Sequence, residues 1–385
     1  MHAPNVRTPI AGHNGTIFVA LELSQRSWLV TMHSPDKDRF SRHKLEGGDD
    51  VGLLRLIERI RNRAAQALGA VPSVVSCYEA GYDGFWLHRR LVGAGIMNFV
   101  FDPASIAVDQ RARRAKTDRI DGEALVRALL AYKRGEPRVC AMVKAPTPHE
   151  EDRRRISRER EVLTAERVQH VNRIKGLLFA QGISNYEPLH RNRRERLEEL
   201  ITGDGRPLPE CLKAQISREL DRLELVIEQV KAVEAERDAL LAQAQARSGV
   251  PAPAAQLLTL RGIGPEAAAT LCSEGLFRTF SNRKQVAAYA GLAPTPWQSG
   301  AVHRDQGVSK AGNPRLRTIM IQIAWLWLRH QPQSALALWY RARLKRTGGR
   351  LGKTMIVALA RKLLVALWKY ATAGVLIEGA VLKPA

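Results

Sequence analysis

Residues 16–23 read TIFVALEL, a run of β-branched and other apolar residues that is typical of a buried strand. Residues 28–32 (WLVTM) have the same character, and residues 39–44 can form a third strand. Three strands followed by alternating helices and strands predict an α/β domain with a mixed sheet. The later elements expected from the pattern are a helix at 49–70 with Asp49 or Asp50 as its N-cap, a strand at 71–78, a helix at 84–92, a strand at 96–101 and a helix at 121–133.

The character of the chain changes near Pro146. Residues 149–175 and 209–247 are charged, with apolar residues three and four positions apart, which predicts a long helical hairpin or coiled coil. Its apolar face is expected to hold Val162, Val168, Val171 and Ile174 from the first helix, and Leu212, Ile216, Leu220, Leu223, Ile227, Val230 and Val233 from the second. The chain beyond this arm is mostly helical. The predicted domains are residues 14–146, 147–250 and 251–385.

The composition indicates a polyanionic partner. The 385 residues carry a formal net charge of +22, of which +13 falls in residues 301–385. Nucleic acid is the first candidate. A membrane surface is a weaker one, because the basic residues are not gathered on one amphipathic helix, and no apolar run is long enough to span a bilayer. The four cysteines are scattered and no apolar leader opens the chain, which favours a reduced, cytoplasmic, nucleoid-associated protein.

Four carboxylates stand out by position. One lies near the end of the first predicted strand, one directly follows the strand at 71–78, and the other two lie three residues apart where a helix begins, so that they can share one face of it. Carboxylates gathered in this way could hold Mg²⁺ ions for phosphodiester chemistry, although a helix-start Asp is more often a cap. The four are Glu22, Glu79, Asp118 and Asp121.

Residues 257–271 (LLTLRGIGPEAAATL) predict two helices joined by a glycine turn. Such a helix–hairpin–helix lets backbone N–H groups approach a phosphate, and a plain helical hairpin is nearly as good an interpretation. Downstream, a helix is expected over residues 282–290, capped by Ser281, and a turn is expected at Ser299-Gly300. A further helix is expected to start at Pro314. Three cations that follow Ser299 in the chain could bind a phosphate. They are Lys310, Arg315 and Arg317.

At these residues the sequence resembles the insertion-sequence-110 family of bacterial DEDD transposases, which is related to the Piv-type DNA invertases. The resemblance covers nearly the whole chain. The matching segments are VALELS, EAGYDGFW and AKTDRIDGEAL in the N-terminal part, and TLRGIGPEAAATL, AYAGLAP, QSG and SKAGNPRLR in the C-terminal part.

The resemblance implies a RuvC-like, RNase H-type first domain, a coiled-coil arm and a C-terminal transposase domain. It implies a magnesium (or manganese) site and a serine nucleophile, and it places a reserve nucleophile at Ser309. The first acidic position departs from the family, which usually shows Asp there, and a Glu reaches one methylene further. The catalytic residues that the resemblance implies are Glu22, Glu79, Asp118, Asp121 and, as nucleophile, Ser299.

The resemblance also implies partners. These are the DNA of the element ends and of the target, a structured noncoding guide RNA, and further copies of the chain in a dimer or tetramer. No membrane is expected among them. The basic C-terminal segment is expected to hold the scissile strand and any guide RNA through Arg341, Arg343, Lys345 and Arg346.

These features together predict a site-specific recombinase that moves an insertion sequence. One alternative is a junction-resolving nuclease, which would use the acidic site with water, so that Ser299→Ala would be harmless. A second is an architectural nucleic-acid-binding protein without enzymatic activity, in which Asp118→Ala and Asp121→Ala would leave function intact.

Overall fold

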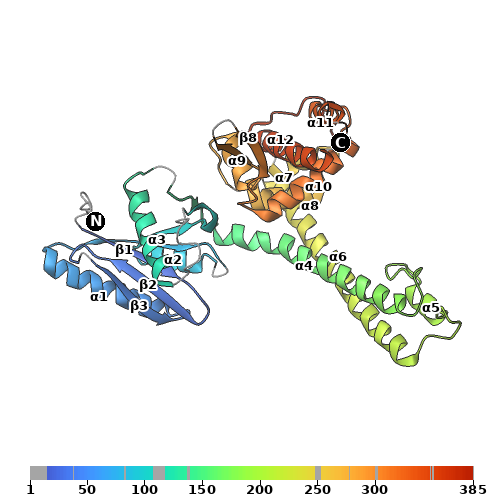
Figure 1. The fold of residues 1–385 in the computed structure, drawn as a ribbon, viewed down its shortest axis with the longest axis horizontal. Coiled ribbons are helices and arrows are strands. Elements are labelled where there is room, and N and C mark those ends of the chain that lie inside the picture. Colours follow the sequence, from blue (N-terminus) through green and yellow to red (C-terminus); the bar gives the residue numbers. More distant parts are fainter. Residues whose placement is uncertain are drawn as a thin grey trace. The chain divides into compact units, whose positions relative to one another are not determined.

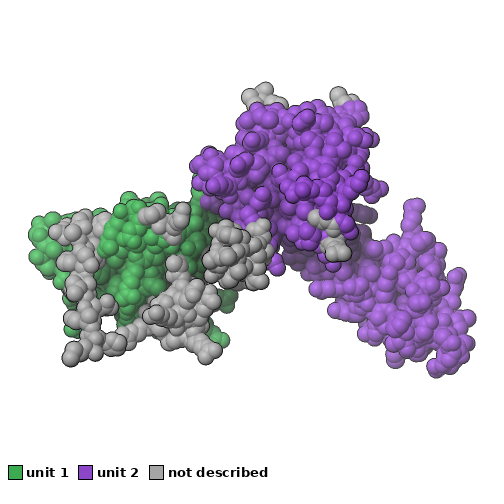
Figure 2. All heavy atoms as spheres, turned by 45° about the horizontal axis from the view of Figure 1, so that its top comes forward, with its two compact units in different colours: residues 1–146 green, residues 147–385 purple. Residues whose placement is uncertain are grey.

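The computed structural model describes residues 15–37, 39–81, 84–106, 118–136, 139–247, 253–276, 278–299, 302–346, 348 and 351–384. The chain divides into two compact units, residues 1–146 and 147–385 (Figure 2). Each unit has hydrophobic cores of its own. Within the described part of the chain, no helix combines the length and the apolar character needed to span a membrane.

A six-stranded mixed sheet forms the centre of the first unit, in the order β3-β2-β1-β4-β5-β6 (Figure 1). The pairs β1–β4 and β4–β5 are parallel, and the others are antiparallel. The predicted α/β domain with a mixed sheet is thus confirmed; only the two-residue β6 was not expected. The strands are β1 (Thr16–Glu22), β2 (Ser27–His33), β3 (Phe40–Glu46), β4 (Ser73–Glu79), β5 (Met97–Phe101) and β6 (Met142–Val143).

Helices cover both faces of this sheet. Side chains alternate along a strand, so Val19 and Leu21 of β1 pack with α1 and α2, whereas Phe18 and Ala20 pack with α3. Two apolar layers therefore hold β1 from opposite sides. The helices are α1 (Asp50–Leu68), α2 (Trp86–Gly93) and α3 (Asp118–Lys133), and a short 3₁₀ helix, η1 (Pro103–Ser105), follows β5.

The second unit begins with a long antiparallel helix pair, α4 and α6, seen side by side in Figure 1. Apolar residues of α6 at the predicted positions are buried against α4. The prediction for α4 was partly wrong: Val162 and Val168 are 54% and 49% exposed, and Leu163 takes their place in the seam. The charged residues on every side of α4 obscure its apolar face. The helices are α4 (Pro148–Phe179), α5 (Arg193–Glu198) and α6 (Glu210–Arg247).

The remainder of the second unit is a helical bundle with one small hairpin. Its core packs α10 against α12 through residues such as Met320, Trp327 and Leu363. The elements are α7 (Pro253–Leu258), α8 (Pro265–Leu271), the π-helix η2 (Cys272–Leu276), α9 (Arg283–Tyr289), β7 (Pro294–Ser299), β8 (Val302–Val308), α10 (Pro314–His330), α11 (Ala335–Arg346) and α12 (Gly352–Ala373).

Two local predictions in this bundle differ from the structure. Asn282, not Ser281, caps α9, because its side chain accepts hydrogen bonds from two backbone N–H groups of the first turn. The antiparallel pair β7–β8 was not expected, because Pro294 and Pro296 interrupt the strand pattern. The pairing register shifts between these two prolines, and a two-stranded sheet leaves the other edge of β7 open, so both prolines are tolerated.

Candidate active site

Two of the predicted carboxylates meet at one edge of the sheet. Leu21 of β1 lies opposite Tyr78 of β4 in a parallel pair, so the next residues, Glu22 and Glu79, end adjacent strands at the same level. Both belong to the face that packs against α3, because residues two positions before them contribute to the α3 core. Parallel pairing therefore brings together two carboxylates that are 57 residues apart in the chain.

Helix α3 approaches this edge very closely at Gly122. A Cβ atom placed on Gly122 would lie 2.9 Å from Oε1 of Glu22 and 2.3 Å from Oγ1 of Thr31. Only a glycine fits between helix and carboxylate here. Gly122 was not predicted from the sequence, although its place directly after Asp121 was a usable signal.

Asp118 and Asp121 lie in the first turn of α3. Their side chains fall outside the described residues, so the backbone alone places them near the end of β1. Among the side chains that are described, no group of three or more His, Cys, Asp or Glu residues is gathered closely enough to hold a metal ion.

The two candidate serines lie near opposite ends of strand β8 in the second unit. Ser299 is the last residue of β7, where it pairs with Val302 at the tip of the hairpin; its side chain is outside the described residues. Ser309 follows β8 directly, and its N–H donates to the carbonyl of Ala293 at 2.9 Å. Seven residues of β8 separate them, a length of about 20 Å. The two serines therefore cannot serve the same phosphate from one chain without a rearrangement.

The segment SKAGN, residues 309–313, is held against the end of α9 by backbone contacts. The N–H of Lys310 donates to the carbonyl of Gly291 at 3.2 Å, and that of Asn313 donates to the carbonyl of Tyr289 at 2.7 Å. Lys310 has a φ of 56°, in the left-handed region, and a Cβ on Gly312 would lie 2.4 Å from the oxygen of Tyr289. This segment is thus fixed in one tight conformation.

A buried glutamate, Glu274, links this segment to helix α4 of the arm by hydrogen bonds. The side chain of Glu274, in the π-helix η2, is only 3% exposed, and it accepts hydrogen bonds from Asn313 at 2.9 Å and from Arg158 of α4 at 3.0 Å. Burial by itself would raise the pKa of Glu274, but the hydrogen bonds from Arg158 and Asn313 and the charges of Arg158 and Arg154 bring it below its ordinary value. Asn313 in turn caps α10. This cluster was not predicted from the sequence.

Two of the cations predicted to bind a phosphate, Arg315 and Arg317, have different partners within the second unit. Arg315 forms an ion pair with Glu161 of α4 at 2.6 Å, and Arg317 donates to the carbonyl of Lys310 at 2.7 Å. Arg315 therefore carries a compensated charge, and Arg317 stabilises the SKAGN segment.

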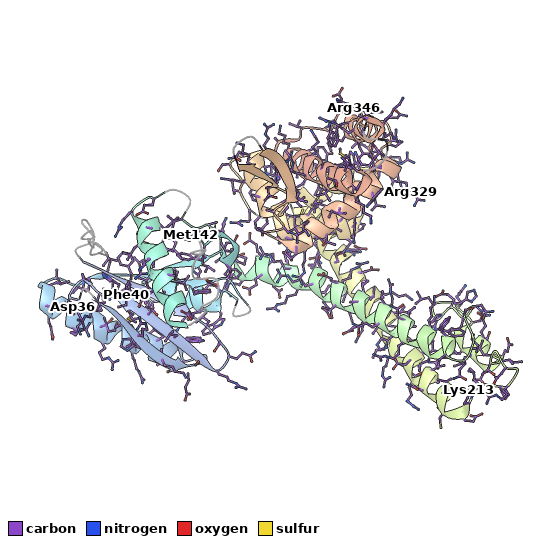
Figure 3. The ribbon with its side chains drawn as sticks, viewed as in Figure 1. Asp36, Phe40, Met142, Lys213, Arg329 and Arg346 are labelled. Carbon is purple, nitrogen blue, oxygen red and sulfur yellow. The ribbon has the colours of Figure 1, made fainter. Side chains whose placement is uncertain are left out.

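The predicted cations of the basic C-terminal segment lie on α11. Arg341 donates to the carbonyl of Pro332 at 2.9 Å. All four are exposed, and Figure 3 labels the last of them, Arg346. The four are Arg341, Arg343, Lys345 and Arg346.

Comparison with known proteins assigns this architecture to a class. Residues 254–339 match the family described as Transposase IS116/IS110/IS902. A protein named as a transposase, y4rJ of Sinorhizobium fredii (strain NBRC 101917 / NGR234), is 63% identical over 99% of this chain and 98% of its own length. The transposase for insertion sequence element IS1328 of Yersinia enterocolitica is 26% identical over 88% of this chain and 95% of its own. That for IS1111A of Coxiella burnetii is 26% identical over 94% of each.

The chain is therefore a transposase of an insertion sequence, an enzyme that acts on DNA. It belongs to the IS116/IS110/IS902 transposase family. The predicted family and enzyme class are confirmed.

Proposed function

We propose that this transposase cuts and rejoins DNA strands with an acidic metal site in the first unit and a serine nucleophile in the second. The observation that carries the proposal is the meeting of Glu22 and Glu79 at one sheet edge, with the start of α3 packed against it. We propose further that the first unit has a RuvC-like fold, that α4 and α6 form a coiled-coil arm over residues 147–250, and that residues 251–385 form the transposase domain.

The donor set suits Mg²⁺ or Mn²⁺. These ions prefer oxygen ligands, and Glu22, Glu79, Asp118 and Asp121 would supply carboxylate oxygens from two strand ends and one helix start. The tight fit of Gly122 against Glu22 leaves one carboxylate oxygen little freedom to move, which suits an ion with strict geometry. When bound, the ion would supply positive charge that activates an attacking oxygen and stabilises a leaving one.

Ser299 would then act by nucleophilic displacement. Its Oγ would bond to a DNA phosphorus and lose its proton, and the bond from that phosphorus to one strand oxygen would break, leaving a protonated hydroxyl on the DNA. A second DNA hydroxyl would then attack the same phosphorus and lose its proton, and the bond from that phosphorus to the serine Oγ would break, so that a new phosphodiester forms and the serine hydroxyl is restored. The position of Ser299 at a hairpin tip supports this role, because a tip can reach into a DNA groove.

We also propose that the chain works as an oligomer with a guide noncoding RNA. The proposal rests on the family resemblance and on the net charge of +22, which suits binding of several nucleic-acid backbones at once.

The test is recombination between element-end DNA and target DNA with Mg²⁺ and the RNA that copurifies with the protein. We expect Glu79→Gln and Ser299→Ala each to abolish recombination while DNA binding persists. Clean cleavage by Ser299→Ala would instead support the junction-resolving nuclease, and full recombination by Glu79→Gln would contradict the acidic site.

A further inference from the structure

A basic groove runs between the edge strand β3 and helix α1 of the first unit. Its volume is about 560 Å³. β3 is the terminal strand of the sheet, so one side of its backbone is not covered by a neighbouring strand (Figure 1). The groove is lined by Arg42, His43, Lys44, Leu45, Gly52, Arg55, Leu56 and Arg59. Four of these residues are cations and none is an acid.

Most of this positive charge is not compensated. Arg42 forms an ion pair with Glu123. Lys44, Arg55 and Arg59 are exposed, and no ion pair joins them to an acid within the part of the chain that the structure describes. Like charges gathered in one groove repel each other, and a polyanion in the groove would relieve that repulsion.

The pKa of His43, which lies in the groove, is lowered from its ordinary value. Burial lowers the pKa of His43 first, and the positive charges of Arg59 and Arg63 lower it further. Arg59 and Arg63 therefore both add positive charge around His43.

One residue of the groove, Lys44, lies on the same face of the sheet as Glu22 and Glu79. In the antiparallel ladders, Glu22 lies opposite Leu29, and Leu29 lies opposite Lys44. All three share the sheet face that packs against α3, so Lys44 lies two strand spacings from Glu22, about 10 Å. That distance corresponds to the rise of about three nucleotides in one DNA strand.

The lining also indicates how a nucleic acid would be contacted. None of the groove residues named above is Phe, Tyr or Trp, and the one aromatic ring, that of His43, is partly buried, so the groove offers no broad exposed platform on which bases could stack. Cations without stacking partners contact phosphates and do not read sequence.

We propose that the groove between β3 and α1 binds the phosphate backbone of the DNA strand that is being processed, near the phosphate that a metal ion at Glu22 and Glu79 would hold. That the bound strand is the one being processed rests on the proposed function. That the groove binds a phosphate backbone does not rest on it. Lys44, Arg55 and Arg59 are positioning residues that hold the strand and do not touch the reacting atoms.

The experiment measures the affinity of the full-length protein for element-end duplex DNA over a range of salt concentrations, in the Ser299→Ala background without Mg²⁺. We expect the triple variant Lys44→Gln, Arg55→Gln, Arg59→Gln to reduce the slope of log K against log salt by up to about 2.7, because each phosphate that is no longer neutralised lowers the slope by about 0.9. The triple variant Lys44→Arg, Arg55→Lys, Arg59→Lys keeps the charges and should keep the slope.

The matched control neutralises three cations of the same unit that are already paired to acids. The control variant is Arg61→Gln, Arg90→Gln, Arg134→Gln, whose partners are Glu58, Asp50 and Glu136. An equal loss of slope in the control, or no loss in the groove variant, would overturn the proposal. The same measurement with RNA copied from the element ends separates the ligands: loss of RNA binding with unchanged DNA binding would also overturn it. Because strand cleavage is not measured, failure of the catalytic proposal would leave these outcomes unaffected.

Discussion

Gly122 of α3 lies so close to Glu22 of β1 that a Cβ on the glycine would be 2.9 Å from the carboxylate Oε1. This is shorter than any ordinary contact between a methyl carbon and an oxygen. The backbone of the helix therefore fixes where the carboxylate can be. Because the helix begins with Asp118 and Asp121, the same contact relates the start of α3 to the end of β1.

We expect Gly122→Ala to reduce strand cleavage strongly. The added methyl group must displace the Glu22 side chain or shift α3 away from the sheet, and the distortion should destabilise the fold by about 1–3 kcal/mol. The control is Gly93→Ala in α2, where a Cβ would meet nothing within 4 Å and which should be neutral or slightly stabilising. Cleavage rates and thermal unfolding of both variants check the prediction. Wild-type cleavage by Gly122→Ala would contradict the close fit at Glu22.

Glu79→Gln should weaken binding of Mn²⁺ as well as abolish cleavage. An amide still offers one oxygen but no charge, and hard cations depend on carboxylate charge. Titration of Mn²⁺ followed by electron paramagnetic resonance measures the affinity directly, without turnover. Glu46→Gln is a suitable control, since Glu46 ends the edge strand β3 and is itself exposed. Equal Mn²⁺ affinity in both variants would contradict a metal ligand at Glu79.

Glu274→Gln should destabilise the second unit by about 1–3 kcal/mol at neutral pH, because it removes charge-assisted hydrogen bonds from a buried group. The pKa of Glu274 is lowered in the folded state. Its contribution to stability is therefore present above the ordinary glutamate pKa and is lost as pH falls through the lowered value.

Chemical unfolding at a series of pH values measures this effect. The stability difference between wild type and Glu274→Gln should shrink as the solution becomes acidic. Glu236→Gln, at an exposed position of α6, should show no such difference. If the difference in unfolding free energy between wild type and Glu274→Gln stayed constant with pH, the charge of the Glu274 carboxylate would not contribute to stability.

Neutralising the four cations of α11 should lower the salt dependence of nucleic-acid binding by about 0.9 for each phosphate that α11 no longer neutralises. The matched control neutralises four cations of the arm that are already paired with acids. Exposed ion pairs of this kind contribute little to stability, so the control should still fold. An unchanged slope in the α11 variant would leave the basic C-terminal segment without a role in binding. The test variant is Arg341→Gln, Arg343→Gln, Lys345→Gln, Arg346→Gln, and the control is Arg155→Gln, Lys175→Gln, Arg206→Gln, Lys213→Gln.

Local pattern predicted the elements well where one physical signal dominated. Asp49 caps α1 and is one of the two residues, Asp49 and Asp50, expected at the start of this helix, because a short acidic side chain before an apolar periodic run is a favoured N-cap. The strand ends at Glu22 and Glu79 were also predictable, since each follows a short run rich in apolar and β-branched residues. The hairpin β7–β8 was not, because its prolines contradict the strand pattern and its stability comes from pairing.

Long-range contacts account for the rest. Glu274 is buried only because Arg158, 116 residues earlier, and Asn313, 39 residues later, converge on it. No local pattern indicates such a pair of partners. Gly122 is similar: its small size is required by Glu22, which lies on a distant strand.

The most direct test of the serine mechanism is to trap and locate a protein–DNA bond. The protein is incubated with Mg²⁺, element-end DNA and its copurifying RNA, the DNA is digested, and the modified peptide is mapped by mass spectrometry. We predict a phosphodiester-linked nucleotide on Ser299, at the tip of the β7–β8 hairpin. An adduct on Ser309, or cleavage without any adduct, would contradict the proposed nucleophile.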